Sequence, residues 1–349
     1  MNICHIQYSL GHGGIETMIV GIVNEQVKTE QVSLIIINNL VDEKLLAKVN
    51  KRVQIIRLNR KPKSKNPFFI LELNYFFLKI KPDVIHSHIP DIVNLIAPFF
   101  RNKVILTRHN TNSSFAIPYF PKYKKIYSIS KSVQQELLKY GFSSEVVYNG
   151  VDIGAISKNA NNNFDSIFRI IQISRLYTEQ KGQHILIEAV ERLVHKHNIN
   201  DIHVDFAGTG SDFDMLAEIV KEKKLEDNIS FLGDVKHFFL EKHICDYDLL
   251  VQPSLFEGFG LTVVEGMAAE IPVLVSDIEG PMEVINYGEF GYYFRKGEAG
   301  DLAEKIMLIM SAKNIEEQKL KVENALQYAE ANFDVKRTAR EYITKYNSL

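Results

Sequence analysis

The sequence contains very little cysteine and no long apolar segment, and each shortage excludes a class of protein. Cys4 and Cys245 are the only cysteines among 349 residues, so neither a disulfide framework nor a cysteine-rich metal site can form. This scarcity favours a reducing compartment. No window holds about 18 uninterrupted apolar residues, which predicts that no helix crosses a membrane. Residues 1–10 lack a basic segment ahead of an apolar one, so we expect no signal peptide and a cytoplasmic protein.

The formal net charge of −2 conceals two halves of opposite sign. Residues 1–150 carry 20 Lys and Arg against 10 Asp and Glu, and the remaining residues carry 21 against 33. A basic half joined to an acidic half is informative about binding partners rather than about fold.

Short β-branched runs alternate with helical patterns along the whole chain, at the spacing of βαβ units. In the first half the expected strands are Ile3–Gln7, Val32–Ile37, Val53–Leu58, Val84–Ser87, Lys103–Thr107, Ile126–Ile129 and Glu145–Tyr148, with helices at Gly14–Val27, Pro67–Ile80 and Lys131–Tyr140. In the second half the expected strands are Phe168–Ser174, His203–Ala207, Ile229–Phe231, Leu249–Gln252, Val273–Val275 and Gly291–Phe294, with helices at Gly182–His195, Phe213–Lys224, Leu261–Ala269, Asp301–Met310 and through Glu316–Leu349. This alternation predicts an α/β protein with two Rossmann-like, doubly wound domains and an interdomain cleft.

A polar stretch at residues 150–165, with the run Asn161–Asn163, separates the two series and is the predicted linker. We therefore expect an N-terminal domain of residues 1–152 and a second domain of residues 153–331. In doubly wound domains ligands bind at the carboxyl ends of the strands.

The most specific motif is PSLFEGFGLTVVEGMA at residues 253–268, where an expected strand enters a glycine-containing loop that opens a helix. Backbone N–H groups at such a helix start bind phosphate, and Gly258 and Gly260 allow a ligand to approach the backbone closely. Glu257 precedes the helix and Glu265 lies inside it, so two carboxylates can hold two parts of one elongated ligand. The alternative is a capping carboxylate and a solvated helical glutamate.

This segment resembles the E-x7-E signature of the retaining glycosyltransferases of family four, which have the GT-B fold. The resemblance implies that Glu257 hydrogen-bonds hydroxyls of the donor sugar and that Glu265 holds the ribose of its nucleotide. Further donor contacts implied by it fall on Phe259, Gly260, Leu261 and Thr262. It also implies that the final helix, about residues 332–349, returns to the N-terminal domain.

A second motif, Ser174-Arg175-Leu176 followed by Lys181-Gly182, begins where the first strand of the second domain ends. Two cations in this place can neutralise a diphosphate leaving group as charge develops on it. Taken alone, two basic loop residues are more often solvated. The same R-L…K-G arrangement occurs in the family and makes Arg175 and Lys181 its pyrophosphate pair.

A glycine-rich loop at residues 11–17 follows the first strand. A dinucleotide fingerprint requires glycine where Glu16 stands and an acidic residue about 20 positions further on, where Asn38-Asn39 occur instead. A dehydrogenase is therefore disfavoured. The loop resembles the Gly-Gly-x-Glu loop of the same transferases, which implies that Gly13 and Gly14 contact donor phosphate and acceptor.

Weaker motifs follow in family order. Thr107-Arg108-His109 resembles a T-x-H turn whose histidine, His109, faces the donor sugar, and the segment after Phe231-Leu232-Gly233 implies base contacts at Asp234 and Val235. Val84-Ile85-His86-Ser87-His88 resembles the family's V-I-H-x-H strand end. A His86–His88 pair suits a metal ion as well, but the sequence offers no evident third ligand.

Two further segments have structural interpretations. Residues 147–152, V-Y-N-G-V-D, resemble the interdomain hinge of the family. Asp246-Tyr247-Asp248 matches the D-x-D metal motif of a different glycosyltransferase fold, but its place before a buried strand predicts a structural role.

The resemblance implies a metal-independent retaining hexosyltransferase without a cofactor, whose co-substrate is a nucleotide-diphosphate sugar, UDP first and GDP next. Its acceptor is expected to be a saccharide, lipid-linked in bacterial surface polysaccharide synthesis. The N-terminal domain is expected to present the acceptor and the second domain to bind the donor. The alternatives are a nucleotide-sugar 2-epimerase of the same fold and a non-catalytic partner subunit.

Cations interleaved with aromatic residues in the basic half suit an anionic membrane surface, and no nucleic-acid motif accompanies them. One group places Arg57, Arg60, Lys61, Lys63 and Lys65 before Pro67-Phe68-Phe69, and another places Lys122, Lys124 and Lys125 among Tyr119, Phe120, Tyr123 and Tyr127. The alternative is an ordinary solvated surface. We expect peripheral attachment to the inner face of the cell membrane.

Overall fold

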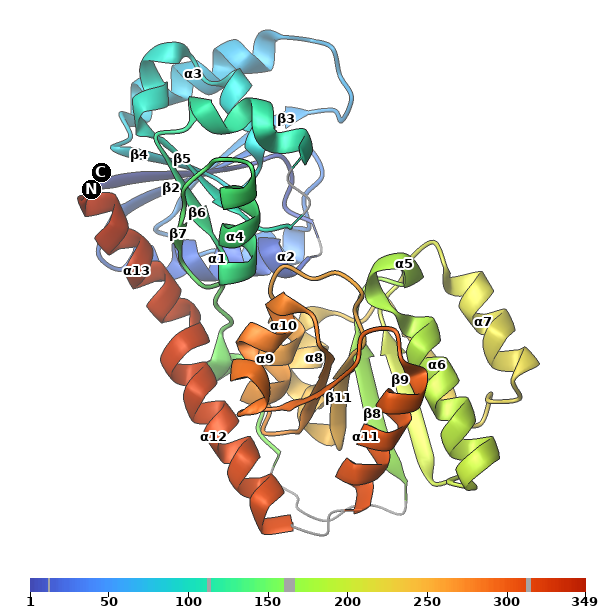
Figure 1. Cartoon of the computed structure of the whole chain (residues 1–349). Helices are drawn as coiled ribbons and strands as arrows, with labels where there is room; N and C mark the ends of the chain where they lie inside the picture. The colour runs from blue at the N-terminus through green and yellow to red at the C-terminus, as the bar shows by residue number, and fades with distance from the viewer. Residues whose placement is uncertain (12, 112–113, 160–166, 312–314) are drawn as a thin grey trace. The chain divides into compact units, whose positions relative to one another are not determined.

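The computed structural model describes residues 1–11, 13–111, 114–159, 167–311 and 315–349 (Figure 1). His12 and the linker run Asn161–Asn163 lie outside these ranges. The chain forms two compact units: unit 1 is Met1–Asp152 with Phe333–Leu349, and unit 2 is Ile153–Asn332. None of the described helices is both long enough and apolar enough to span a bilayer.

Unit 1 contains a seven-stranded, wholly parallel sheet in the order β3-β2-β1-β4-β5-β6-β7. Its strands are β1 (Asn2–Gln7), β2 (Gln31–Asn38), β3 (Gln54–Arg60), β4 (Val84–Ser87), β5 (Val104–Arg108), β6 (Lys125–Ser128) and β7 (Glu145–Val146). The chain runs outward from β1 to β3 and then returns to place β4 on the other side of β1. The carboxyl ends of β1 and β4 therefore form a topological switch point.

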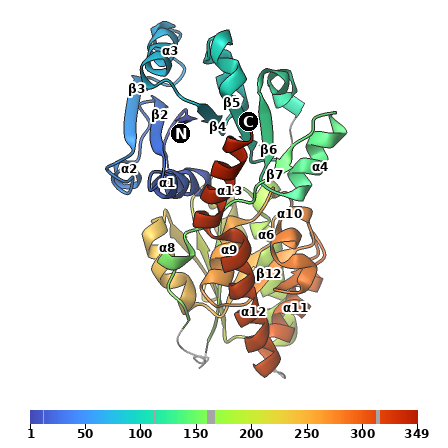
Figure 2. The same ribbon diagram turned by 90° about the vertical axis from the view of Figure 1, so that its left-hand side faces the viewer.

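Helices cover both faces of this sheet, as parallel sheets require. They are α1 (Gly14–Gln26), α2 (Glu43–Ala47), α3 (Phe68–Ile80), α4 (Lys131–Lys139) and α13 (Val335–Asn347), with 3-10 segments at Pro90–Leu95, Pro98–Lys103 and Ser114–Lys122. The last helix, α13, lies along α1 and buries Ala339, Tyr342 and Tyr346 in the same core as the side chains of β1 and β2 (Figures 1 and 2). The C-terminal helix is thus an integral layer of unit 1.

Two connecting segments are paired inside unit 1. The Val151 N–H donates to the Phe333 carbonyl at 2.8 Å, and the Val335 N–H donates to the Val151 carbonyl at 2.9 Å. A Cβ at Gly150 would lie 2.5 Å from the Val335 Cα, so only glycine allows this close approach. The helical pattern predicted through Glu316–Leu349 is interrupted here, because Asp334 has extended backbone and its carboxylate caps α13.

Unit 2 contains a six-stranded parallel sheet in the order β10-β9-β8-β11-β12-β13. Its strands are β8 (Phe168–Ile173), β9 (Ile202–Ala207), β10 (Ile229–Gly233), β11 (Leu249–Gln252), β12 (Val273–Ser276) and β13 (Tyr292–Phe294). Its helices are α5 (Thr178–Lys181), α6 (Gln183–Glu191), α7 (Phe213–Glu222), α8 (His237–His243), α9 (Leu261–Ala268), α10 (Glu279–Val284), α11 (Ala299–Ser311) and α12 (Ile315–Phe333). The order reverses between β8 and β11, which are neighbours, so the second switch point lies at their carboxyl ends.

The predicted α/β class and both parallel sheets are confirmed. The expected helix at Gly182–His195 is shorter than predicted: α6 ends at Glu191 and a π-helical turn, Arg192–Lys196, follows it. The sequence also missed α5 and α8, because these helices are only one or two turns long and show no apolar periodicity.

Candidate active site

The β8/β11 switch point of unit 2 brings together the two strongest sequence motifs. Arg175 lies two residues after β8, Lys181 ends the short helix α5, and Glu257 lies in the loop between β11 and α9. Residues more than 70 positions apart in the sequence therefore meet at one edge of the sheet, as the rule for doubly wound folds requires.

The two loops contact each other through their backbones. A Cβ at Gly182 would lie 2.0 Å from the Pro253 carbonyl oxygen, and Gly182 has a φ of +66°, so both space and conformation require glycine. The Leu255 N–H donates to the Gln180 carbonyl at 2.8 Å. This contact fixes the position of the Lys181 loop relative to the Glu257 loop.

Lys181 and Glu257 form an ion pair through Nζ and Oε2. The same carboxylate oxygen accepts a hydrogen bond from Gln252 Nε2 at 3.2 Å, and Gln252 Oε1 accepts from the Thr262 hydroxyl at 3.3 Å. The side chains of Lys181 and Glu257 remain 15% and 20% exposed, so a ligand can reach both charges. The Glu257 carboxylate, which Gln252 holds in place, therefore orients the Lys181 ammonium group.

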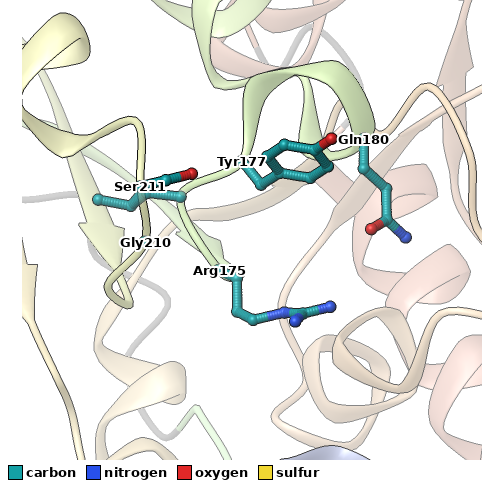
Figure 3. A pocket seen from close by; sticks show the side chains of 6 residues that line it. Arg175, Tyr177, Gln180, Gly210 and Ser211 are labelled. Atoms are coloured by element: carbon teal, nitrogen blue, oxygen red, sulfur yellow. The ribbon is translucent and has the colours of Figure 1, made fainter.

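Arg175 is exposed, and its guanidinium group makes no ion pair or hydrogen bond within the described part of the chain. It borders a hollow of about 350 Å³ that is also lined by Leu176, Tyr177, Gln180, Gly210 and Ser211. Figure 3 shows Arg175, Tyr177 and Gln180 along one segment of the chain, with Gly210 and Ser211 on a neighbouring loop. A guanidinium group that borders an open hollow is suited to binding an anionic ligand.

The loop before α9 is held tightly. Gly260 has a φ of +119°, which favours glycine, and Leu261 and Thr262 begin the helix directly after it. Phe259 is buried. A Cβ at Gly280, at the start of α10, would lie 2.5 Å from the Glu257 carbonyl oxygen. Gly280 thus supports the Glu257 loop, a role that no sequence motif indicated.

Glu265 is buried within α9 and faces a histidine that sequence reasoning missed. His237 Nε2 lies 3.4 Å from Glu265 Oε1, and His237 Nδ1 lies 3.1 Å from Glu241 Oε1. Burial alone would lower the pKa of His237, but the two carboxylates outweigh it and raise that pKa to about 10. The His237 imidazolium therefore neutralises a buried carboxylate at neutral pH.

The residues proposed to contact the base lie nearby in sequence. Asp234 and Val235 occupy the short connection between β10 and α8, and the Val235 N–H donates to the Gly233 carbonyl at 2.9 Å. They precede His237 by three and two positions, so the predicted base contacts lie next to the histidine that pairs with Glu265.

The predicted donor contacts Gly13 and Gly14 stand at the start of α1. Gly13 precedes α1 with a φ of −177°, ordinary extended backbone, and Gly14 is the first residue of the helix. A Cβ at Gly13 would lie 2.3 Å from Glu16 Oε2. The crowding atom is the end of the flexible Glu16 side chain, which can move, so this contact alone does not require glycine at position 13.

The β1/β4 switch point of unit 1 contains four buried histidines: His5, His86, His88 and His109. The structure supplies a candidate third ligand for the His86–His88 pair that the sequence did not make evident, because His5 places a ring nitrogen within 4.8 Å of both. However, both ring nitrogens of His86 are engaged, with the Tyr346 hydroxyl at 2.6 Å and the Thr107 hydroxyl at 2.7 Å. Hydrogen bonds thus occupy nitrogens that a metal would need.

The remaining motifs behave as structural elements. Asp248 accepts a hydrogen bond from the Arg169 N–H at 2.7 Å, and Asp246 Oδ2 lies 2.7 Å from His243 Nδ1. Asp248 thus ties the start of β11 to β8.

Two parallel doubly wound sheets, with cations and carboxylates gathered at the switch point of the second, agree with the predicted GT-B fold. The family model described as Glycosyl transferases group 1 matches residues 155–327, and that of Glycosyltransferase Family 4 matches residues 12–154. The chain therefore belongs to the family-four glycosyltransferases.

Characterised and uncharacterised relatives agree with this membership. An uncharacterised glycosyltransferase of Methanocaldococcus jannaschii is 28% identical, over 83% of this chain and 86% of its own length. The N-acetylgalactosamine-N,N'-diacetylbacillosaminyl-diphospho-undecaprenol 4-alpha-N-acetylgalactosaminyltransferase of Campylobacter jejuni is 26% identical, over 81% of this chain and 83% of its own length.

Solved structures show the same fold. Anabaena HepE in complex with UDP and glucose superposes with a TM-score of 0.85 at 20% identity, covering 100% of both chains. Staphylococcus aureus TarM in complex with Fondaparinux, alpha-GlcNAc-glycerol and UDP gives a TM-score of 0.79 at 15% identity, covering 99% of this chain and 100% of TarM.

Proposed function

We propose that this enzyme transfers a sugar, with retention, from a UDP-sugar to a hydroxyl of a lipid-linked saccharide in polysaccharide synthesis, with a GDP-sugar as the next candidate donor. The observation that carries the proposal is the cluster at the β8/β11 switch point. There Arg175 and Lys181 supply two cations, and Glu257 a carboxylate held beside one of them.

In this proposal the second domain, predicted as residues 153–331 and corresponding to unit 2, binds the donor. Arg175 and Lys181 bind the diphosphate and stabilise the charge that develops as it departs. Glu257 accepts hydrogen bonds from sugar hydroxyls, and Glu265 accepts them from the ribose. The His237 imidazolium lies beside Glu265 and compensates the charge of this buried side chain.

Smaller contributions come from the loops around this cluster. Backbone and hydroxyl groups of Phe259, Gly260, Leu261 and Thr262 contact sugar and phosphate in the proposal. Asp234 and Val235 contact the base.

Unit 1, residues 1–152 with the C-terminal helix, presents the acceptor in this proposal. Gly13 and Gly14 approach donor phosphate and acceptor, and His109 faces the donor sugar. No carboxylate in a recognised motif is placed as a covalent nucleophile, so the departing phosphate takes the proton of the acceptor hydroxyl on the same face.

Two comparisons support the choice of substrates. HepE and TarM were both solved with UDP, which favours uracil as the base of the donor nucleotide. The name of the Campylobacter jejuni relative describes transfer to a saccharide on diphospho-undecaprenol, which favours a lipid-linked acceptor.

The 2-epimerase and partner-subunit alternatives predict different products. An epimerase would convert the nucleotide sugar without any acceptor, and a partner subunit would leave it unchanged. The Glu257/Glu265 pair together with the Gly13-Gly14 loop favours transfer.

We expect the protein to bind UDP in a thermal-shift screen of UDP, GDP, ADP and their sugars, and to release UDP from its donor only when acceptor is present. Turnover is expected to be unchanged by EDTA, because Arg175 and Lys181 supply the positive charge that a metal would otherwise bring to the diphosphate. A turnover lost in EDTA and restored by Mg²⁺ or Mn²⁺ would reject these two roles. Acceptor-independent conversion of the donor would favour the epimerase.

The proposed membrane surface is the outer face of α3. Phe68, Leu71, Tyr75 and Leu78 are between 56% and 70% exposed, and their spacing of three and four residues places them on one side of the helix. Exposed apolar side chains in a row, next to lysines, suit the interface of an anionic bilayer.

The cations before α3 divide into two kinds. Arg57 pairs with Glu43 at 2.9 Å, and the Arg60 guanidinium lies 4.8 Å from the centre of the Phe69 ring. Lys61, Lys63 and Lys65 form no ion pair within the described residues, which leaves them for lipid headgroups.

The second basic group does not form the surface that the sequence predicted. Phe120, Tyr123 and Tyr127 are buried: Phe120 lies in the 3-10 segment Ser114–Lys122, Tyr123 directly follows it, and Tyr127 lies on β6. Lys125 is paired with Glu145. The membrane proposal therefore depends on α3 and the lysines before it.

We expect the protein to sediment with anionic vesicles, and not with neutral ones, with binding that weakens as salt rises. Replacing Lys61, Lys63 and Lys65 by serine should reduce binding about tenfold or more, since each cation near such a surface contributes up to about 1 kcal/mol. A matched control replaces three exposed lysines of unit 2: Lys196, Lys221 and Lys319. Equal recovery in the supernatant under all conditions would favour a soluble acceptor.

A further inference from the structure

A continuous chain of buried hydrogen bonds crosses the β1/β4 switch point of unit 1. Gln26 Oε1 lies 2.8 Å from His5 Nε2, His5 Nδ1 lies 3.4 Å from His88 Nε2, and His88 Nδ1 lies 3.0 Å from His109 Nε2. All four side chains are at most 6% exposed. At the far end, His109 Nδ1 is buried and has no hydrogen-bond partner within the described residues.

We infer that Gln26, acting through His5 and His88, is a positioning residue that determines which ring nitrogen of His109 carries the proton. The inference rests on the proposed function only where it concerns the sugar. The tautomer of each histidine follows from the chain of hydrogen bonds alone.

The three imidazoles are neutral at physiological pH. Burial lowers the pKa of His5 to about 4 and that of His109 to about 3, and it lowers the pKa of His88 well below its usual value. A neutral imidazole has one N–H donor and one acceptor nitrogen, so each link in the chain determines the next.

The amide of Gln26 sets the direction of the chain. Its carbonyl oxygen can only accept, so His5 is protonated at Nε2 and accepts at Nδ1. His88 then donates from Nε2 and accepts at Nδ1, and His109 donates from Nε2. The outcome is a lone pair on His109 Nδ1.

A lone pair at this position has a defined ligand preference. It accepts a hydrogen bond from a hydroxyl and repels a carbonyl or phosphate oxygen. If His109 faces the donor sugar, as proposed, the relay selects a donor with a free hydroxyl there. The inverted tautomer would place an N–H at the same point and lose this selectivity.

The second branch of the histidine cluster supplies an internal control. His86 packs on His88 with ring centres 4.2 Å apart, but its nitrogens bond to hydroxyls of Thr107 and Tyr346 and not to the relay. Thr107→Val removes a hydroxyl from this branch and leaves the four side chains of the relay unchanged.

The test is long-range ¹H–¹⁵N NMR of histidine side chains in the full-length protein, without ligand. The expected result is protonation at Nε2, with unprotonated Nδ1, for His5, His88 and His109. In Gln26→Met, a mixture of tautomers is expected at His109, whereas Thr107→Val should leave its tautomer unchanged.

Two results would overturn the inference: an Nδ1-protonated His109 in the wild-type protein, or a Gln26→Met variant with the wild-type tautomer. If Gln26→Met does not fold, the wild-type spectrum alone decides. In the transfer assay, Gln26→Met is expected to raise the donor KM about three- to tenfold with little change in kcat, the effect of one lost hydrogen bond. Because the NMR measurement needs no turnover, failure of the relay and failure of the proposed function are distinguishable.

Discussion

Replacing Lys181 by alanine is expected to lower kcat/KM for sugar transfer by about 10²–10³, the loss typical of removing one donor to a developing oxyanion. Arg175→Ala and Glu257→Gln are expected to be similarly severe. The reason is that these groups act on charge that is largest in the transition state, so the chemical step suffers more than ground-state binding. Glu265→Gln, by contrast, should act mainly by weakening nucleotide binding. Steady-state kinetics and nucleotide affinity measured on each variant separate the two effects.

The ion pair between Lys181 and Glu257 adds a sharper expectation. Each single substitution removes one charge and leaves its partner unpaired. The fold-decrease in kcat/KM of the double variant Lys181→Ala/Glu257→Gln should therefore be much smaller than the product of the fold-decreases of the two single variants. Lys223→Ala is a matched control, because Lys223 pairs with Glu191 at 2.7 Å elsewhere in unit 2. Near-normal turnover in Lys181→Ala and Glu257→Gln would place the active site elsewhere.

Acidification is expected to destabilise unit 1 strongly between pH 7 and pH 5. Burial lowers the pKa of His5 to about 4 and that of His109 to about 3, and holds the pKa values of His86 and His88 well below the usual 6.5. The folded unit keeps these rings neutral, whereas the unfolded chain protonates them below pH 6.5. Stability is therefore fully present above pH 6.5 and is lost as the pH falls toward the folded pKa values.

The size of this loss approaches the whole stability of a domain. Each buried histidine removes about 1 kcal/mol per pH unit below 6.5, so four remove about 4 kcal/mol per unit, against a typical total of about 5–15 kcal/mol. Unit 2 has the opposite case in His237, whose pKa is raised to about 10. Its contribution is complete below pH 6.5 and is lost only toward pH 10.

Differential scanning calorimetry and denaturant titrations followed by circular dichroism test this, since the chain has no tryptophan for fluorescence. One unfolding transition should move to lower temperature between pH 7.5 and pH 5, and His88→Gln should reduce its pH dependence. His197→Gln, at an exposed histidine, should not. An unfolding free energy independent of pH over this interval would contradict the prediction.

The sequence alone predicted the two parallel sheets and the strand ends at which the main charged residues lie. Arg175 and Lys181 follow one strand and Glu257 follows another, and parallel sheets gather strand ends at one edge. What could not be predicted was the ion pair between Lys181 and Glu257, because it depends on the contact of Gly182 with Pro253.

The missed residues share a physical reason. His5 lies within an apolar strand and reads as core, and its partnership with His86 and His88 follows from the pairing of β1 with β4, which the sequence does not encode locally. Gln26 is likewise an ordinary residue near the end of a helix until the fold places it against His5. His237 and Glu241 lie on a two-turn helix whose apolar side chains are partly exposed, so no periodicity marked it.

The return of the C-terminal helix to unit 1 affects the order in which the protein can fold during translation. Domains usually fold in the order of their synthesis. Here the sheet of unit 1 emerges from the ribosome first but lacks Val335, Ala339 and Tyr342 until residues 333–349 have been made. Unit 2 lies wholly within residues 153–332, so the later unit has its complete core before the earlier one does. The nascent N-terminal unit therefore exposes the apolar face of α1 throughout the synthesis of unit 2. We expect a chaperone to bind this apolar surface during that period.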